Sequence, residues 1–326
     1  MYRITFLLLF AALAFTACEK VAFQSETEIN NLNVFDEFAQ LFQEKYAMFE
    51  QKNVDWEMLT DSVRATIDGQ TSQRELADKM GGLVKRLRDG HTSLTTGDAY
   101  YSHELLDGYP LNFDTTRFVP IPDLTDLSGG GYKTIGDYGY IVIADFTAWA
   151  EAESEQALEA LQDTEGLIID VRVNGGGDPE VAADLAGRFT ETAYFAGIEA
   201  FKTGPGPDDF SPSRITLRPT EGVSYTDKRV ALLQARLSYS ATTTLIYLSD
   251  PNPNVATFGS RSGGGTGSVA SGYLINGWEW NMSVSDYEDT QGRKFDDGIE
   301  ADFPVLDDLD TDEDEVIGAA LDWLRG

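Results

Sequence analysis

Two short apolar runs separated by one helical segment constrain the fold of this chain most strongly. The runs GYIVIADF (139–146) and GLIIDVR (166–172) are rich in β-branched residues and lack an alternating polar face, which is typical of strands buried on both sides. The segment EAESEQALEALQD (151–163) between them is predicted to be a helix. A strand, a helix and a strand in this order predict a right-handed crossover between parallel strands. We therefore expect an α/β fold.

The chain beyond residue 172 continues this alternation. It predicts a helix at 178–189, buried strands at 229–235 and 255–259, and a hairpin at 272–284. The hairpin is expected to turn at Asn276-Gly277, the preferred type I′ pair, and Thr311 or Asp312 is expected to cap a last helix. Together these elements predict one domain over residues 137–326 with a mixed, largely parallel sheet.

Residues 32–95 predict helices alone. Aromatic residues three or four positions apart indicate the buried face of a first helix, namely Phe35, Phe38, Phe42, Tyr46 and Phe49. Asp55 can cap a second helix, and Ser72 with Glu75 forms a capping box for a third. We expect the third helix to end at Gly90 in the left-handed conformation that glycine tolerates. Residues 32–95 thus predict a small helical domain, followed by a loop-rich connection over 96–136.

The N-terminus has the pattern of a secretory signal peptide. A basic residue precedes an apolar run that is too short to span a bilayer, and small residues then lead to Cys18, the only cysteine. The context FTAC at Cys18 resembles a bacterial lipobox, in which the cysteine becomes the lipidated first residue; the alternative is a chance cysteine in an ordinary signal peptide. With a signal at 1–18 and a tether at 19–31, we expect a lipid-anchored protein of the bacterial cell envelope, facing the periplasm or the exterior.

Net charge limits the partners of this protein. The chain has 24 Lys and Arg against 55 Asp and Glu, which gives a formal charge of −31 at pH 7. Such a negative field repels phosphate backbones and anionic lipid. We therefore expect no nucleic-acid binding, and membrane contact only through a lipid on Cys18. No zinc-ligand spacing or nucleotide fingerprint is present, so neither a metal nor a cofactor is expected.

Two stretches place small residues just after buried strands, where ligands bind in open α/β sheets. Asn174 is followed by Gly175 to Gly177, whose bare backbone amides could form a phosphate cradle, an oxyanion hole, or a tight turn without a ligand. Ser240 follows the strand at 229–235 and leads a helix, so it is either an N-cap or a nucleophile beside helix-start amides. A third stretch, DDGIEAD (296–302), clusters acids that alone indicate a solvated surface.

The order of these stretches resembles the tail-specific, or C-terminal processing, serine peptidase family. The matching motifs are DGHT (89–92), IIDVRVNGGG (168–177), SYSA (238–241), TFGSRSGGG (257–265), LING (274–277) and DDGIEAD (296–302). The resemblance implies a crotonase/ClpP-like core, with Ser240 as the acylating nucleophile. It also implies an oxyanion hole made by the amide of Ala241 and one from Gly175 or Gly176. The interval between Thr92 and Gly139 is too short for a PDZ domain, so the resemblance is to PDZ-lacking members.

The resemblance also identifies the base. Processing peptidases of this family use a lysine in a turn that here reads Gly259 to Gly265 and contains no lysine. The chain most resembles the tricorn-core/interphotoreceptor retinoid-binding-protein-like branch. In tricorn-like members a histidine at the DGHT position does this work, which implies His91 as the general base. The closing segment implies Asp297 or Asp296 as the acid that orients it, in place of a glutamate.

Two other functions fit parts of the pattern. The family resemblance implies an exported peptidase that acts on peptides or unfolded protein tails. The missing lysine favours instead a non-catalytic peptide-binding or ligand-binding lipoprotein on the same fold. A crotonase-type acyl-CoA enzyme would use the same glycine loop, but an export signal and the lack of basic residues for the nucleotide phosphates argue against it.

Overall fold

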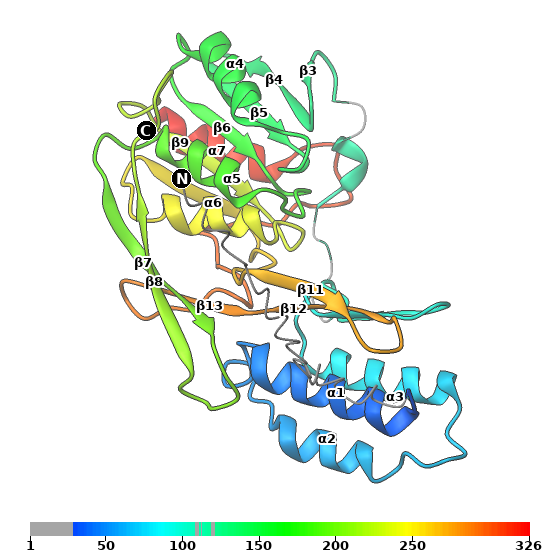
Figure 1. Cartoon of the computed structure of the whole chain (residues 1–326). Coiled ribbons are helices and arrows are strands. Elements are labelled where there is room, and N and C mark those ends of the chain that lie inside the picture. The colour runs from blue at the N-terminus through cyan, green and yellow to red at the C-terminus, as the bar shows by residue number, and fades with distance from the viewer. Residues whose placement is uncertain (1–28, 108–110, 112, 119–120) are drawn as a thin grey trace, which may run out of the picture.

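The computed structural model describes residues 29–326 except 108–110, 112 and 119–120 (Figure 1). The predicted signal and Cys18 lie outside the described residues. The helices are α1 (Asn31–Lys45), α2 (Trp56–Arg64), α3 (Gln73–Arg86), α4 (Glu151–Leu161), α5 (Pro179–Gly187), α6 (Ala241–Ser249) and α7 (Glu315–Arg325), with a 3-10 helix η1 (Thr115–Phe118). Among the described residues, no helix has the length and apolar character needed to cross a membrane.

The strands form three sheets. They are β1 (Ser93–Thr95), β2 (Tyr100–Ser102), β3 (Thr125–Leu127), β4 (Gly130–Ile135), β5 (Tyr138–Ile143), β6 (Leu167–Asp170), β7 (Tyr194–Lys202), β8 (Phe210–Leu217), β9 (Val230–Gln234), β10 (Val255–Gly259), β11 (Val269–Tyr273), β12 (Glu279–Ser283), β13 (Ser285–Asp289) and β14 (Phe303–Pro304). The central sheet has the order β14-β10-β9-β6-β5-β4-β3. Its first five strands are parallel, and β4 and β3 add antiparallel partners. The predicted mixed, largely parallel sheet is therefore confirmed.

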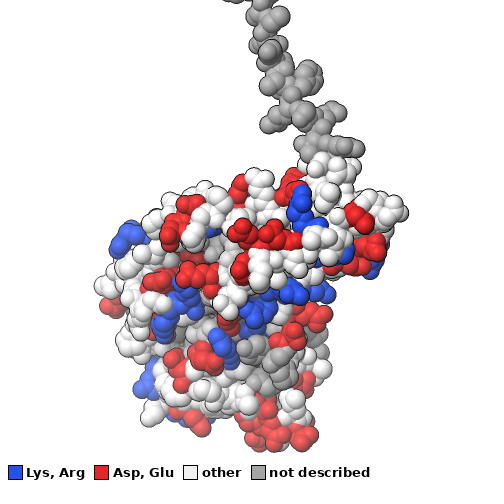
Figure 2. Space-filling model, turned by 90° about the horizontal axis from the view of Figure 1, so that it is seen from below, with Lys and Arg blue, Asp and Glu red and all other residues white. Residues whose placement is uncertain are grey.

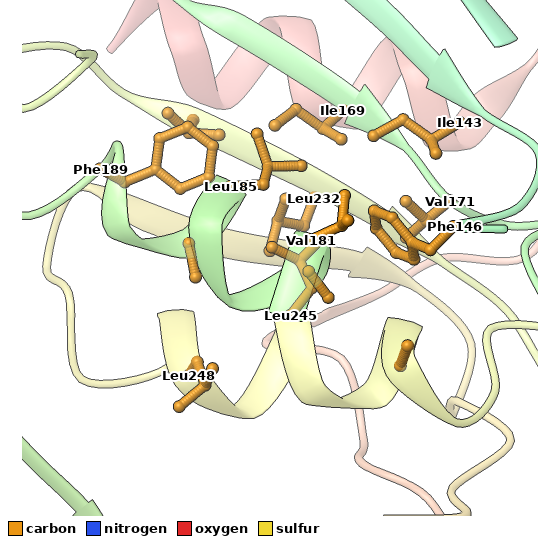
Figure 3. Close-up of a cluster of buried hydrophobic side chains, with 14 of the residues drawn as sticks. Ile143, Phe146, Ile169, Val171, Val181, Leu185, Phe189, Leu232, Leu245 and Leu248 are labelled. Atoms are coloured by element: carbon orange, nitrogen blue, oxygen red, sulfur yellow. The ribbon is translucent and has the colours of Figure 1, made fainter. Parts of the chain in front are cut away.

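Both faces of the central sheet are covered, as the unbroken apolar runs predicted. One hydrophobic cluster receives Leu167, Ile169, Val230 and Leu232, and the opposite cluster receives Ile168, Ala231 and Leu233. This alternation follows from the two-residue period of a strand. Figure 3 shows the first cluster, where side chains of α5 and α6 pack against the sheet. The second face packs against α7 through Val316, Ala320 and Leu324.

The three N-terminal helices pack on a separate four-stranded sheet of order β11-β12-β1-β2 (Figure 1). Their shared core contains Phe35, Phe38 and Phe42 of α1 together with Trp280 and Met282 of β12. The rest of the predicted aromatic stripe lies past the helix, which ends at Lys45. Strand β1 directly follows α3, and its Ser93 pairs with Asn281 of β12. The β11–β12 hairpin is thus the surface on which the three helices pack. Because β1 must pair with β12, this packing fixes the direction in which the chain leaves α3.

A three-stranded ribbon of order β13-β7-β8 flanks the core, and sequence patterns did not indicate β7 or β8. The β7–β8 hairpin runs beside the core toward the helices (Figure 1). Gln43 Nε2 of α1 donates a hydrogen bond of 3.1 Å to the carbonyl of Pro205, in the loop between these strands. The segment 96–136, expected to be rich in loops, also contains β2, η1, β3 and β4.

Three predicted turns and caps differ from the structure. After α3 the left-handed residue is Arg88 (φ 51°) rather than Gly90. Gly90 is needed for another reason, because a Cβ there would lie 2.8 Å from the hydroxyl oxygen of Tyr239. The predicted hairpin forms, but of Asn276 and Gly277 only the glycine has a positive φ, so the turn is not type I′. Asp314, rather than Thr311 or Asp312, caps α7 because its carboxylate accepts from the amide of Ile317.

Candidate active site

Ser240 occupies a strained turn between β9 and α6. Its backbone has φ 58° and ψ −122°, a conformation that residues with a Cβ rarely adopt. Neighbouring loops hold the turn in place, because the Ser240 amide donates to the carbonyl of Gly264 (2.8 Å) and the Tyr239 amide donates to that of Asn174 (3.1 Å). A sharp strand-to-helix turn that presents a serine hydroxyl is the geometry of a nucleophile elbow.

The Ser240 hydroxyl does not cap α6. No side-chain hydrogen bond to the first turn is present, so of the two sequence interpretations the N-cap is wrong. Instead Ser240 Oγ lies 2.9 Å from Nε2 of His91, across 149 positions of sequence. The structure therefore places a serine hydroxyl and an imidazole within hydrogen-bonding distance, which is the arrangement that a nucleophile and its base require.

His91 is held by its own loop and by Tyr239. Asp89 Oδ1 accepts from the His91 amide (2.8 Å), and Asp89 Oδ2 accepts from the Thr92 hydroxyl (2.8 Å). The rings of His91 and Tyr239 pack at a centroid distance of 4.8 Å and an angle of 60°. Asp89 is buried and its bond to Thr92 is shielded from water, and the two bonds together fix the backbone from which the imidazole projects.

Burial lowers the pKa of His91, and the nearby carboxylate of Asp89 only partly opposes this effect. A lowered pKa keeps the imidazole neutral at pH 7, so that Nε2 can accept a proton. Among the described residues, Nδ1 of His91 has no hydrogen-bond partner.

The predicted oxyanion donors differ in availability. The amide of Ala241, the first residue of α6, has no acceptor among the described residues and lies beside Ser240. The amide of Gly176 instead donates to Oδ1 of Asn174 (2.8 Å), so the prediction that Gly176 donates to an oxyanion is corrected. Gly175 is exposed, and Gly177 lines the hollow that contains Ser240. The donors that remain are Ala241 with Gly175 or Gly177.

Gly176 has a steric role instead. Its φ of 112° is one that a residue with a Cβ rarely adopts. A Cβ at this position would lie 2.6 Å from Cβ of Ser240 and 3.2 Å from the amide nitrogen of Ala241. The glycine loop therefore packs directly against the serine turn, and only glycine permits this approach.

The two acids predicted to orient His91 bind a lysine instead. Lys52, in the loop between α1 and α2, forms an ion pair with Oδ2 of Asp296 and a 2.6 Å hydrogen bond to Oδ1 of Asp297. Neither carboxylate hydrogen-bonds to the His91 ring. The prediction that Asp296 or Asp297 contacts the base is therefore corrected: the sequence contained no signal that a lysine 245 positions away would take both acids.

The Lys52 cluster joins the helical unit to the core in a region shielded from water. The side chains of Lys52 and Asp296 are only 3% and 2% exposed. Burial and the charge of Asp89 raise the pKa of Asp296 to about 7, against the opposing effect of Lys52. Burial alone would lower the pKa of Lys52, but Asp296 and Asp297 raise it above its ordinary value. Lys52 is therefore a cation and a poor candidate for a base.

Replacing Lys52 by methionine is expected to lower the free energy of unfolding by about 3 kcal/mol or more, because removing one partner leaves a buried carboxylate uncompensated. Urea unfolding at pH 7.5 measures this change. The exposed Lys85→Met variant is the control and should lose under about 0.5 kcal/mol. Adding Asp296→Asn to Lys52→Met should recover part of the loss, and a Lys52→Met protein as stable as wild type would contradict this account.

A hollow of about 360 Å³ opens beside Ser240. Its lining comes from α6, from the turn at Gly265 to Val269 and from the β7-β8-β13 ribbon. The serine hydroxyl, its base, a free amide and a space for a ligand thus meet in one place. Such a constellation supports acyl transfer from a bound carbonyl compound.

The family model for peptidase family S41 matches residues 137–305, which is just over half of the chain. The chain belongs to peptidase family S41. A candidate peptidase from Parabacteroides merdae is 28% identical, with a TM-score of 0.84 over 91% of this chain and 97% of that one. No curated protein matches the sequence.

Two other solved structures share the fold of this S41 protein but have little sequence identity with it. The photosystem II D1 C-terminal processing protease is 13% identical, with a TM-score of 0.58 over 88% of this chain and 96% of that one. A lipoprotein from Streptococcus agalactiae is 16% identical, with a TM-score of 0.59 over 91% and 96%. Both likenesses concern the fold alone.

Sequence reasoning missed four residues at this S41 site. Glu199 on β7, which lines the hollow beside Ser240, lies in a segment without a motif. Lys52 lies in a loop and Tyr239 in the SYSA motif, but the sequence analysis gave neither of them a role. Asp89 was detectable, since an aspartate two residues before His91 is typical of an Asx turn. In such a turn the carboxylate of Asp89 accepts a hydrogen bond from the amide of His91, as the structure has it.

Proposed function

We propose that this S41 protein is an exported serine peptidase that hydrolyses peptide bonds in peptides or unfolded protein tails. The observation that carries the proposal is the 2.9 Å contact between Ser240 Oγ and His91 Nε2 in a chain of this family. The strained backbone of Ser240 supports it, because such strain concentrates at functional sites.

The chemistry begins with proton transfer from Ser240 to His91. As Oγ attacks the scissile carbonyl carbon, Nε2 of neutral His91 takes the hydroxyl proton and the carbonyl oxygen becomes an oxyanion. The imidazolium then gives this proton to the leaving amine, which leaves an acyl group on Ser240. A water molecule, deprotonated by His91, hydrolyses the ester and restores the hydroxyl.

Backbone amides would stabilise the oxyanion. The free amide of Ala241 starts α6, where the helix dipole also favours negative charge. Gly175 or Gly177 would supply the second donor. Each such donor contributes on the order of 10²-fold to the rate.

His91, and no lysine, serves as the base. The turn from Gly259 to Gly265 has Arg261 in place of a lysine, and its guanidinium lies 3.6 Å from the carboxylate of Glu300. Lys52 is held as a cation between Asp296 and Asp297. A buried imidazole with a lowered pKa is suited to accept a proton at neutral pH.

Hydrolysis of an unstructured polypeptide of the casein type tests this function. The purified protein is expected to generate new peptide termini, detected by mass spectrometry. A protein that binds such chains without producing new termini would indicate a binding lipoprotein on the same fold, which the missing acid at Nδ1 of His91 favours as the second candidate.

The pH dependence of activity follows from the state of His91. A base works when neutral, and a lowered pKa keeps it neutral to a lower pH than an ordinary histidine. We therefore expect kcat/KM to rise with pH through a midpoint below about 6.5 and to be flat near pH 7. Initial rates between pH 4.5 and 8 measure this limb, and a midpoint above 7 would contradict the assignment.

We also propose that a lipid on Cys18 anchors the protein in the bacterial cell envelope. The FTAC context supports this location, and the fold is shared with a lipoprotein. Incorporation of labelled palmitate into the wild-type protein, and its loss in Cys18→Ser, is the expected result. Equal labelling of both proteins would overturn it.

A further inference from the structure

One carboxylate in the hollow beside Ser240 has no part in the chemistry above. Glu199, on β7, lines this hollow together with Ile215, Thr244, Tyr247 and Tyr287. The same hollow contains Ser240 and Ala241, so a group bound in it lies next to the reacting carbonyl. A substrate residue flanking the scissile bond would place its side chain here.

Glu199 is fixed in position. Its Oε1 accepts hydrogen bonds from the hydroxyls of Ser268 (2.6 Å) and Ser285 (2.5 Å), one from the loop after Gly265 and one from β13. Within the described part of the chain, no Lys, Arg or His lines the hollow, and Glu199 forms no ion pair. The structure therefore holds a carboxylate at the wall of a pocket without supplying a cation for it.

The other walls suit an apolar stem. Tyr247 and Tyr287 stack with ring centroids 4.0 Å apart, and Ile215 faces the same space. Burial, and then the charge of Glu199, raise the pKa of Tyr247, which lines the same hollow as that carboxylate. The hydroxyl of Thr266, also on the lining, is buried and has no partner among the described residues. The apolar rings can pack against the stem of a long side chain, and the carboxylate of Glu199 with the Thr266 hydroxyl can bind a polar group at its tip.

We propose that this hollow is a specificity pocket for a lysine or arginine side chain next to the scissile bond. The methylene stem packs on Tyr247 and Ile215, and the cationic tip binds the carboxylate of Glu199. The proposal rests on the proposed peptidase function, for which it names the substrate class.

The charge of the whole molecule acts in the same direction. A net charge of −31 attracts basic peptides and repels acidic ones before binding. On the face shown in Figure 2, Asp and Glu side chains gather in several groups with fewer Lys and Arg between them. Since salt screens this attraction over about 10 Å at 0.1 M, the pocket rather than the surface must account for selectivity at moderate salt.

Binding to the Ser240→Ala protein tests the pocket independently of turnover. Fluorescence polarisation at 0.15 M salt measures Kd for peptides of one sequence that carry lysine, norleucine or glutamate at each position in turn. At one position we expect lysine to bind about 10-fold or more tightly than norleucine, and glutamate more weakly than both. Adding Glu199→Gln should reduce the lysine-to-norleucine ratio to under about 3-fold.

Matched variants separate the pocket from general charge. Glu221→Gln removes one exposed carboxylate outside the hollow and should keep the ratio. Glu199→Asp keeps the charge and should retain part of the preference, and thermal melts check that each variant is folded. Equal affinity for lysine and norleucine peptides at every position, or a ratio unchanged by Glu199→Gln, would overturn the inference.

The two proposals fail in different ways. If the wild-type protein cleaves peptides but the lysine preference is absent, only the specificity pocket is wrong. If the preference depends on Glu199 but the wild-type protein cleaves nothing, only the peptidase function is wrong, and the hollow is a binding site for basic peptides.

Discussion

Replacing Ser240 by alanine is expected to lower kcat/KM for peptide hydrolysis by about 10⁴-fold or more, the loss typical of an enzyme that loses its nucleophile. The hydroxyl has no other structural task, since it does not cap α6 and, among the described residues, hydrogen-bonds to His91 alone. The Ser240→Ala variant should therefore fold normally. Hydrolysis rates for one fluorogenic peptide, with melting curves for both proteins, measure the effect.

Ser271→Ala provides the control for this substitution. Ser271 is an exposed serine on β11, away from the Ser240 turn in sequence and outside the lining of the hollow. Its variant should retain wild-type activity within about twofold. Comparable hydrolysis by Ser240→Ala and Ser271→Ala would show that Ser240 is not the nucleophile.

Replacing His91 by alanine is expected to lower kcat/KM by about 10³-fold to 10⁴-fold, because no other described group is positioned to take the serine proton. Of the described side chains, only the His91 ring is placed against Ser240 Oγ by a hydrogen bond. The residual rate would come from the oxyanion donors and from substrate binding.

His103→Ala is the matched control, because His103 is the only other histidine in the chain. It lies after β2 and takes no part in the contact with Ser240. We expect the His103 variant to keep activity within a few-fold of wild type. A His91→Ala protein that is equally active would require a different base.

The core of the fold was predictable because its signal is local. Buried strands such as 139–146 and 166–172 carry unbroken β-branched runs, and the helices begin at caps that a few neighbouring residues define. The pairing of β1 with β12 was not predictable, since it joins segments that are 188 positions apart and each only three to five residues long. The β7–β8 ribbon has mostly half-buried or exposed residues and therefore no clear period.

The site was predictable to the extent that motifs mark it. Recognisable motifs surround Ser240, His91 and Ala241, and the structure brings Ser240 and His91 within 2.9 Å of each other. Their catalytic roles stay predictions. The contacts of Asp296 and Asp297 were not predictable, since a DDG segment alone does not reveal that a buried Lys52 binds both carboxylates. Gly176 is not available as an oxyanion donor, because its amide donates to the side-chain oxygen of Asn174.

The proposed catalytic groups come from two parts of the molecule. The helical unit and its strand β1 supply His91, and the core supplies Ser240 with its glycine loop. Lys52 joins the same two parts through Asp296 and Asp297, close to the loop of Asp89. We therefore expect the packing of the helical unit to be required for the proposed activity, in addition to its contribution to stability.

The most direct test of the account is the site at which a fluorophosphonate reacts. A fluorophosphonate phosphonylates a serine, with loss of fluoride, only when a base activates the hydroxyl. After incubation at pH 7, intact mass and peptide mapping should show one adduct, on Ser240, in the wild-type protein and none in His91→Ala. An unmodified wild-type protein, an adduct on another residue, or equal labelling of Ser240 in both proteins would contradict the catalytic pair of Ser240 and His91.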